Sequence, residues 1–222
     1  MVTEAIIQKE FAEISSKYVK LHEPEKIDNI WQICGEYDVI DPNGYCWDTY
    51  SIKIIIPHQF PYVLPTLFET SGKIEQTDKW HNVLGCCLST EAIMYRELGL
   101  PISLVKWLDR FVYDFLANHV IKTRENNYAK GEFSHGTEGI IEGYYEVFTT
   151  NDAKIVYQKL RLLCNSTHLG RNAPCFCNSN KKYKNCFLQT PYTHALLGIP
   201  VSVIENNYRE INNYLLKKNK SH

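Results

Sequence analysis

Residues 30–56 read IWQICGEYDVIDPNGYCWDTYSIKIII, and this stretch decides the fold class. Its two ends, Ile30–Ile40 and Tyr45–Ile56, are rich in the aromatic and β-branched side chains that favour β-strands. Between them, residues 41–44 read Asp-Pro-Asn-Gly, a combination typical of a tight turn. The stretch therefore predicts two antiparallel strands joined as a hairpin.

Helical patterns lie on both sides of this hairpin. Apolar residues recur at helical spacing in Thr3–Leu21 and, most clearly, in Pro101–Arg124. Thr66–Thr70 is typical of a short third strand. Together these segments predict an α+β fold in which an antiparallel meander is flanked by helices.

The rest of the chain predicts a smaller helical region. One helix is expected from Thr137 to Phe148, a second ends at Leu163, and a last helix covers Val203–Lys218. Three domains are therefore expected: residues 1–125 as the α+β domain, 126–165 as a helical linker region, and 166–222 as a small cysteine-rich region with a terminal helix.

Composition excludes several classes of protein. The chain has 222 residues, a hydrophobic share of 44% and a formal net charge of -1. This composition excludes a disordered chain, a strongly basic nucleic-acid-binding protein and an acidic tail protein. No apolar run is long enough to cross a bilayer, and residues 1–13 lack the apolar core of a signal peptide. We therefore expect a cytoplasmic protein with no membrane partner.

The eight cysteines are clustered, which favours thiol chemistry and metal binding over a disulfide framework. Cys86 and Cys87 are adjacent in the irregular segment Ser71–Gly99. A thiolate suits acyl transfer because it attacks and leaves readily, and a carboxamide such as Asn82 can stabilise the tetrahedral oxyanion. His81 can order the loop or tune the thiol. Two other interpretations stay open, a buried apolar pair and a vicinal disulfide switch.

Several short motifs follow one another along the first 125 residues. They are Trp31, Gly35, Ile52–Pro57, Phe60-Pro61-Tyr62, Pro65, His81-Asn82, Gly85 and Cys87-Leu88. In this order they resemble the ubiquitin-conjugating (UBC) fold, specifically the divergent conjugating-like enzymes of bacterial defence and ubiquitin-like operons. The chain departs from that family where His-Pro-Asn is usual, because no proline separates His81 from Asn82.

The resemblance implies a cysteine enzyme that carries a partner protein's C-terminal carboxyl as a thioester and transfers it to an amine. It assigns the nucleophile to Cys87, which directly precedes Leu88, with His81 and Asn82 as further catalytic residues and Cys86 as the competing thiol. The partner it implies is a ubiquitin-like protein or, in short type-II CBASS antiphage systems, the cyclic-oligonucleotide synthase. The alternative is a catalytically inactive UBC/RWD-like adaptor that recruits partners.

Three further cysteines have a spacing typical of metal ligands. Cys175, Cys177 and Cys186 lie within residues 169–186, and this segment resembles the SEC-C motif, a small zinc knuckle. A knuckle of about twenty residues cannot bury a core, so bound zinc must supply its folding energy. The family usually has Cys or His directly after the third cysteine, where this chain has Phe187.

The fourth zinc ligand and the function of the knuckle stay open. A structural zinc site takes four protein ligands, and His168, His194 and Cys164 are the alternatives for the fourth. The basic residues of the motif leave nucleic-acid binding as a weaker alternative to protein docking. Glu132 and His135, just before the helix at Thr137, can orient a nucleophile near the cysteines or belong to a turn.

Overall fold

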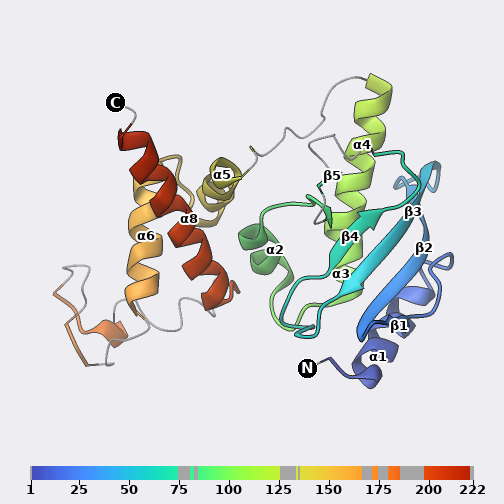
Figure 1. Ribbon diagram of the computed structural model, residues 1–222, viewed down its shortest axis with the longest axis horizontal. Coiled ribbons are helices and arrows are strands. Elements are labelled where there is room, and N and C mark those ends of the chain that lie inside the picture. Colours follow the sequence, from blue (N-terminus) through green and yellow to red (C-terminus); the bar gives the residue numbers. More distant parts are fainter. Residues whose placement is uncertain are drawn as a thin grey trace. The chain divides into compact units, whose positions relative to one another are not determined.

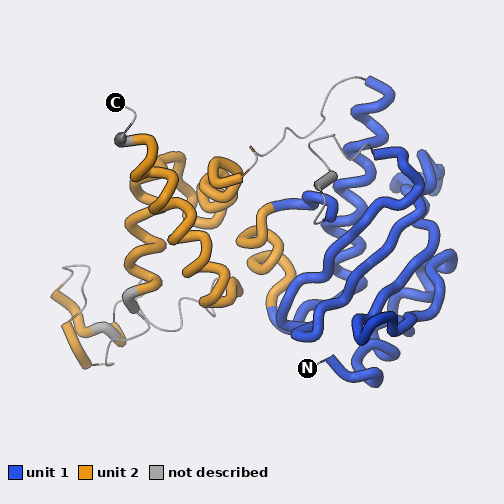
Figure 2. The backbone as a smooth tube through the Cα atoms, viewed as in Figure 1, with its two compact units in different colours: residues 1–89, 100–132 blue, residues 90–99, 133–222 orange. Residues whose placement is uncertain are grey.

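The computed structural model divides into two compact units (Figure 2). Unit 1 comprises Met1–Ser89 and Leu100–Glu132, and unit 2 comprises Thr90–Gly99 and Phe133–His222. The domain boundaries expected after residues 125 and 165 did not anticipate that residues 90–99 cluster with the second unit. The structure describes residues 2–74, 81–82, 85–125, 134, 136–166, 172–174, 180–185 and 198–220.

Unit 1 is built on a four-stranded antiparallel sheet (Figure 1). The strands lie in chain order: β1 (Glu25–Ile27), β2 (Ile30–Ile40), β3 (Cys46–Ile56) and β4 (Thr66–Glu69). The turn between β2 and β3 forms because the Asp41 carboxylate accepts hydrogen bonds from the backbone N–H groups of Asn43 and Tyr45, both at 2.9 Å. The predicted antiparallel meander and the α+β class are confirmed. The short β1 was not predicted, because its three residues are all exposed and carry no alternating pattern.

One face of the sheet forms the core of unit 1. In β3 the alternate residues Tyr50, Ile52, Ile54 and Ile56 are buried, and the residues between them are partly exposed. The long helix of this unit, which ends in α4 (Tyr113–Glu125), packs against β2 and β3 on that face (Figure 1). The apolar residues that predicted the strands therefore also form the core.

Helix α1 (Glu4–Ser15) is shorter than the predicted Thr3–Leu21. It begins after Thr3, whose side chain accepts a hydrogen bond from the N–H of Ile6. It ends early because the chain joins the sheet edge at Leu21, which forms a bridge with Gly35. A Cβ at Gly35 would lie 2.3 Å from the Lys20 carbonyl oxygen, so the close approach requires glycine.

The helix predicted over Pro101–Arg124 begins three residues later than expected. It consists of α3 (Leu104–Trp107), a π-helical segment (Leu108–Val112) and α4. The N–H of Leu104 donates to the Glu10 carboxylate at 2.8 Å, which satisfies one of the free groups at the helix start and ties it to α1.

Unit 2 is helical in the part that the structure describes. Its helices are α2 (Glu91–Leu98), α5 (Thr137–Phe148), α6 (Ala153–Ser166) and α8 (Val201–Lys220). α6 lies beside α8, where Tyr157 and Tyr208 stack with ring centroids 5.4 Å apart (Figure 1). Helix α2 falls in the segment that the sequence predicted to be irregular, because eight residues are too few for a clear periodicity. Among the described helices, none is both long and apolar enough to span a membrane.

Candidate functional site

The cysteine segment, defined as His81–Asn82 together with Gly85–Leu88, forms a small hairpin beside β4. Strand β5 (His81–Asn82) pairs with β6 (Gly85–Cys86) in antiparallel register, with His81 opposite Cys86 and Asn82 opposite Gly85. The backbones of the predicted catalytic residues His81 and Asn82 and of the competing thiol Cys86 therefore share one hairpin. Cys87, the predicted nucleophile, follows directly.

Gly85 fixes how closely this hairpin approaches the sheet. Its φ is 122°, and a Cβ at this position would lie 2.4 Å from Cγ2 of Thr66 and 2.9 Å from the carbonyl oxygen of Leu67. The positive φ and the close contacts with β4 both exclude a larger side chain at this position unless the backbone moves. The residue directly before the cysteine pair thus packs β6 against β4.

Cys86 is held in a setting that suppresses its reactivity. Burial raises the pKa of its thiol to about 12, a hydrogen bond from the Glu69 backbone partly offsets this, and the Glu69 carboxylate and the Cys87 thiol raise the pKa further. Because the thiolate is the nucleophilic form, Cys86 is a poor nucleophile near neutral pH.

Cys87 lies in a different setting, although it is the next residue. Its side chain is exposed, and the N–H of Leu88 donates to the carbonyl of Cys86 at 3.1 Å. This bond closes a three-residue turn with Cys87 at its centre. The geometry therefore favours Cys87 as the thiol that a large substrate reaches. The interpretation as a buried apolar pair does not fit Cys87, which is exposed, and Cys86 is half-buried.

A turn after β4 belongs to the same site and was not predicted as part of it. The buried carboxylate of Glu69 accepts hydrogen bonds from the backbone N–H groups of Ser71, Gly72 and Ile74, at the start of the segment that leads to the cysteines. Residues 70–72, which read Thr-Ser-Gly, are the sequence signal for a turn at this point.

The described residues next to the predicted zinc ligands fold back on each other. Pro174 and Lys182 form an isolated antiparallel bridge, and a short 3-10 helix covers Tyr183–Asn185. These residues directly precede the first and third cysteines of the motif in the chain. The cysteines themselves lie outside the described residues: Cys175, Cys177 and Cys186.

Of the alternatives for the fourth ligand, only Cys164 lies in the described part of the chain. It is half-buried in α6, and burial together with Glu205 raises the pKa of its thiol to about 11, partly offset by Arg209. Within the described ranges, no group of three or more His, Cys, Asp or Glu residues is arranged to hold a metal ion. The other predicted residues lie outside the described ranges: Glu132, His135, His168, Phe187 and His194.

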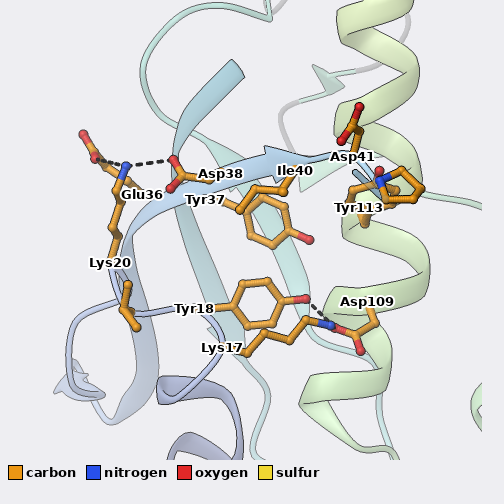
Figure 3. Close-up of a pocket in the computed structure, with 12 residues that line it drawn as sticks. Lys17, Tyr18, Lys20, Glu36, Tyr37, Asp38, Ile40, Asp41, Asp109 and Tyr113 are labelled. Carbon is orange, nitrogen blue, oxygen red and sulfur yellow. Dashed lines mark hydrogen bonds and ion pairs between the residues drawn. The ribbon is translucent and has the colours of Figure 1, made fainter. Parts of the chain in front are cut away.

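Unit 1 also has a pocket of about 410 Å³ between the end of α1, strand β2 and the long helix (Figure 3). Lys17 and Tyr18 both donate to the Asp109 carboxylate, the lysine at 2.7 Å. Lys20 lies between Asp38 and Glu36, at 2.8 Å and 3.7 Å. The lining cations are thus already paired with carboxylates of the pocket, and no described residue of the cysteine segment lines it.

Comparison with known proteins supports one part of these predictions. Residues 171–186 match the SEC-C motif, and this match covers the three predicted zinc cysteines. No curated protein and no solved structure matches the chain. The resemblance of the first 125 residues to ubiquitin-conjugating enzymes therefore depends on the motifs of this chain and on the order of its elements.

Proposed function

We propose that this chain is a ubiquitin-conjugating-like enzyme that carries a partner protein's C-terminal carboxyl as a thioester on Cys87 and transfers it to an amine. The observation that carries the proposal is the placement of Cys87, which is exposed at the centre of a short turn on a hairpin packed against the sheet through Gly85. Acyl carriage requires a thiol that a large substrate reaches and that the backbone holds in place.

The proposed reaction has two steps. The Cys87 thiolate attacks the carbonyl carbon of an activated acyl group, such as a thioester on a separate activating protein; a C–S bond forms and the first thiolate leaves. The acceptor amine then attacks the same carbon, so that a C–N bond forms, the C–S bond breaks, and the amine proton passes to solvent. We assign Asn82 and the backbone N–H groups near Gly85 to stabilise the oxyanion, and His81 to order the loop or tune the thiol.

The partner and the biological setting follow from the same resemblance. The motifs resemble those of conjugating-like enzymes in bacterial defence, so we propose a cytoplasmic role in antiphage defence. The substrate is then the C-terminal tail of a ubiquitin-like protein or of a cyclic-oligonucleotide synthase.

We further propose that the SEC-C motif binds zinc and docks a partner. Its cysteines Cys175, Cys177 and Cys186 provide thiolates, which zinc prefers in structural sites. The bridge between Pro174 and Lys182 supports a chain reversal at this motif. A fourth ligand then comes from His168, His194 or Cys164, since Phe187 cannot bind a metal.

The experiment that tests the enzyme is a search for a covalent adduct in cells that carry the native operon. Wild-type protein should form a partner-linked species that a thiol reductant removes on an immunoblot. Cys87→Ala should eliminate the adduct, Cys86→Ala should retain it, and Cys87→Ser should replace it by a species that resists reductant, because an oxyester forms.

Two outcomes contradict this proposal in different ways. Loss of the adduct in Cys86→Ala with retention in Cys87→Ala would move the nucleophile by one residue. An unchanged result in every variant, including protection in a phage challenge, would favour the adaptor without catalytic activity.

A further inference from the structure

Glu69, the last residue of β4, is a carboxylate with only 5% of its surface exposed. It accepts hydrogen bonds from the backbone N–H groups of Ser71 at 2.7 Å, Gly72 at 3.1 Å and Ile74 at 3.3 Å, and also from the Ser71 hydroxyl. A buried carboxylate is costly unless hydrogen bonds replace its water. These donors supply that replacement, and in turn they fix the path of the chain as it leaves the sheet.

Lys73 holds the same turn from its other side. Its Nζ donates to the Asp48 carboxylate at 2.5 Å and to the Thr49 carbonyl at 2.7 Å, both near the start of β3. Ile74, which follows, is buried. Residues 71–74 are therefore tied to two strands before the chain continues towards the cysteines.

The main chain of Glu69 reaches the other end of the same segment. Strand β6, which contains Cys86, lies against β4, and the Glu69 backbone acts on the Cys86 thiol as a hydrogen-bond partner that lowers its pKa. The next residue, Thr70, donates to the Ser51 carbonyl at 2.8 Å, which keeps this part of β4 in the sheet. Glu69 thus acts at both ends of the segment between β4 and the cysteines. Its carboxylate holds the residues that leave the sheet, and its backbone lies beside Cys86, where the chain returns.

We propose that Glu69 is a positioning residue for the cysteine pair, which keeps the Cys86 sulfur against the sheet and so presents Cys87 outward. Cys86 lies in β6 beside β4, and Cys87, at the centre of the turn that follows directly, is exposed. A role of Glu69 in thioester transfer rests on the proposed function. The effect of Glu69 on the reactivity of the two thiols does not depend on that function.

The test is native-state alkylation with iodoacetamide, read by fragmentation of the tryptic peptide that contains both thiols. The measured quantity is the ratio of the Cys87 rate to the Cys86 rate. It should be at least about tenfold in the wild type, because Cys87 is exposed and the raised pKa of Cys86 lowers the thiolate content of Cys86. Glu69→Ala should lower this ratio at least about fivefold, and Glu69→Gln, which keeps one acceptor oxygen, should lower it less. Glu36→Gln, at an exposed carboxylate of β2, is the matched control and should leave it unchanged.

Three results separate positioning from a general effect on stability. An unchanged ratio in folded Glu69→Ala and Glu69→Gln proteins would overturn the proposal, even if both melt earlier than the wild type. If Glu69→Ala does not fold by circular dichroism, the ratio of the two alkylation rates in Glu69→Gln decides. Amide exchange of the wild type provides a further check, since rapid exchange of Ser71, Gly72 and Ile74 would contradict the hydrogen bonds to Glu69.

The alkylation experiment and the adduct experiment fail independently. A changed ratio without any partner adduct would support the role of Glu69 and contradict the enzyme. An adduct on Cys87 with an unchanged ratio in the Glu69 variants would support the enzyme and contradict the role of Glu69.

Discussion

The described residues around the two groups of cysteines differ in how they pack. Beside Cys86 and Cys87, Gly85 packs on β4, and the Glu69 backbone is a hydrogen-bond partner that lowers the pKa of the Cys86 thiol. Around the SEC-C motif, the described residues are mostly exposed and contribute one isolated bridge and one turn of 3-10 helix. We therefore expect packing to place the first group, and the proposed zinc to supply the folding energy of the second.

The strongest test of this comparison is substitution in the SEC-C motif. Cys175→Ser should remove nearly all of the about one equivalent of zinc expected in protein purified without added metal, because a structural site depends on its full ligand set. Elemental analysis measures the loss. The thermal transition of unit 1 should stay in place, and Cys34→Ser, at an exposed cysteine of β2, should lose no zinc. Metal-free wild-type protein with a folded motif would contradict the zinc proposal.

The second test changes the packing of the first group. Gly85→Ala should lower the free energy of unfolding by about 3 kcal/mol, since the added Cβ overlaps β4 and the backbone keeps a positive φ. Gly44→Ala is the matched control: its φ is also positive at 88°, but its Cβ would have nothing within 4 Å, so about 1 kcal/mol is expected. Denaturant unfolding measures both, and equal losses would show that the close contact with β4 does not matter.

A third test measures how much a buried hydrogen bond between the helices of unit 2, outside the SEC-C motif, stabilises this unit. The buried Asn207 amide donates to the Tyr144 hydroxyl at 3.2 Å, so Tyr144→Phe should cost about 1–2 kcal/mol by leaving that donor without its acceptor. Tyr214→Phe also removes a hydroxyl hydrogen bond, to Glu138, but at an exposed site, and should cost less than about 0.5 kcal/mol. Denaturant unfolding measures both losses of free energy. Equal losses would mean that burial of the Asn207–Tyr144 hydrogen bond adds nothing to stability.

The smallest expected effect is the pH dependence of Cys86. Its pKa in the folded protein is raised, so the folded state keeps a proton that the unfolded state loses, and stability falls as pH rises above the ordinary thiol pKa. The difference between the wild type and Cys86→Ala should change by no more than about 1 kcal/mol between about pH 8 and about pH 9. A difference that stays constant over this range would show that the Cys86 thiol is not protected in the fold.

Local sequence patterns predicted most of the regular structure of unit 1. Strand β2 has the predicted bounds, because its aromatic and β-branched residues alternate and the Asp41 turn is a local interaction. Helix α1 was predicted too long, because its end depends on a bridge between Leu21 and Gly35, which are distant in sequence. Helix α2 was missed because its five buried residues in eight show no single apolar face.

For the candidate site, too, some features followed from the sequence and others only from the tertiary structure. The sequence by itself identified the cysteine pair, the SEC-C motif and the antiparallel hairpin, since each depends on residue type and short spacing. Only the tertiary structure decided that Cys86 is held against the sheet while Cys87 is exposed, and that Glu69 contacts both ends of the intervening segment. The reason is physical: burial, pKa and close approach to Gly85 come from atoms of β4, and a residue's neighbours along the chain do not determine which strand packs against it.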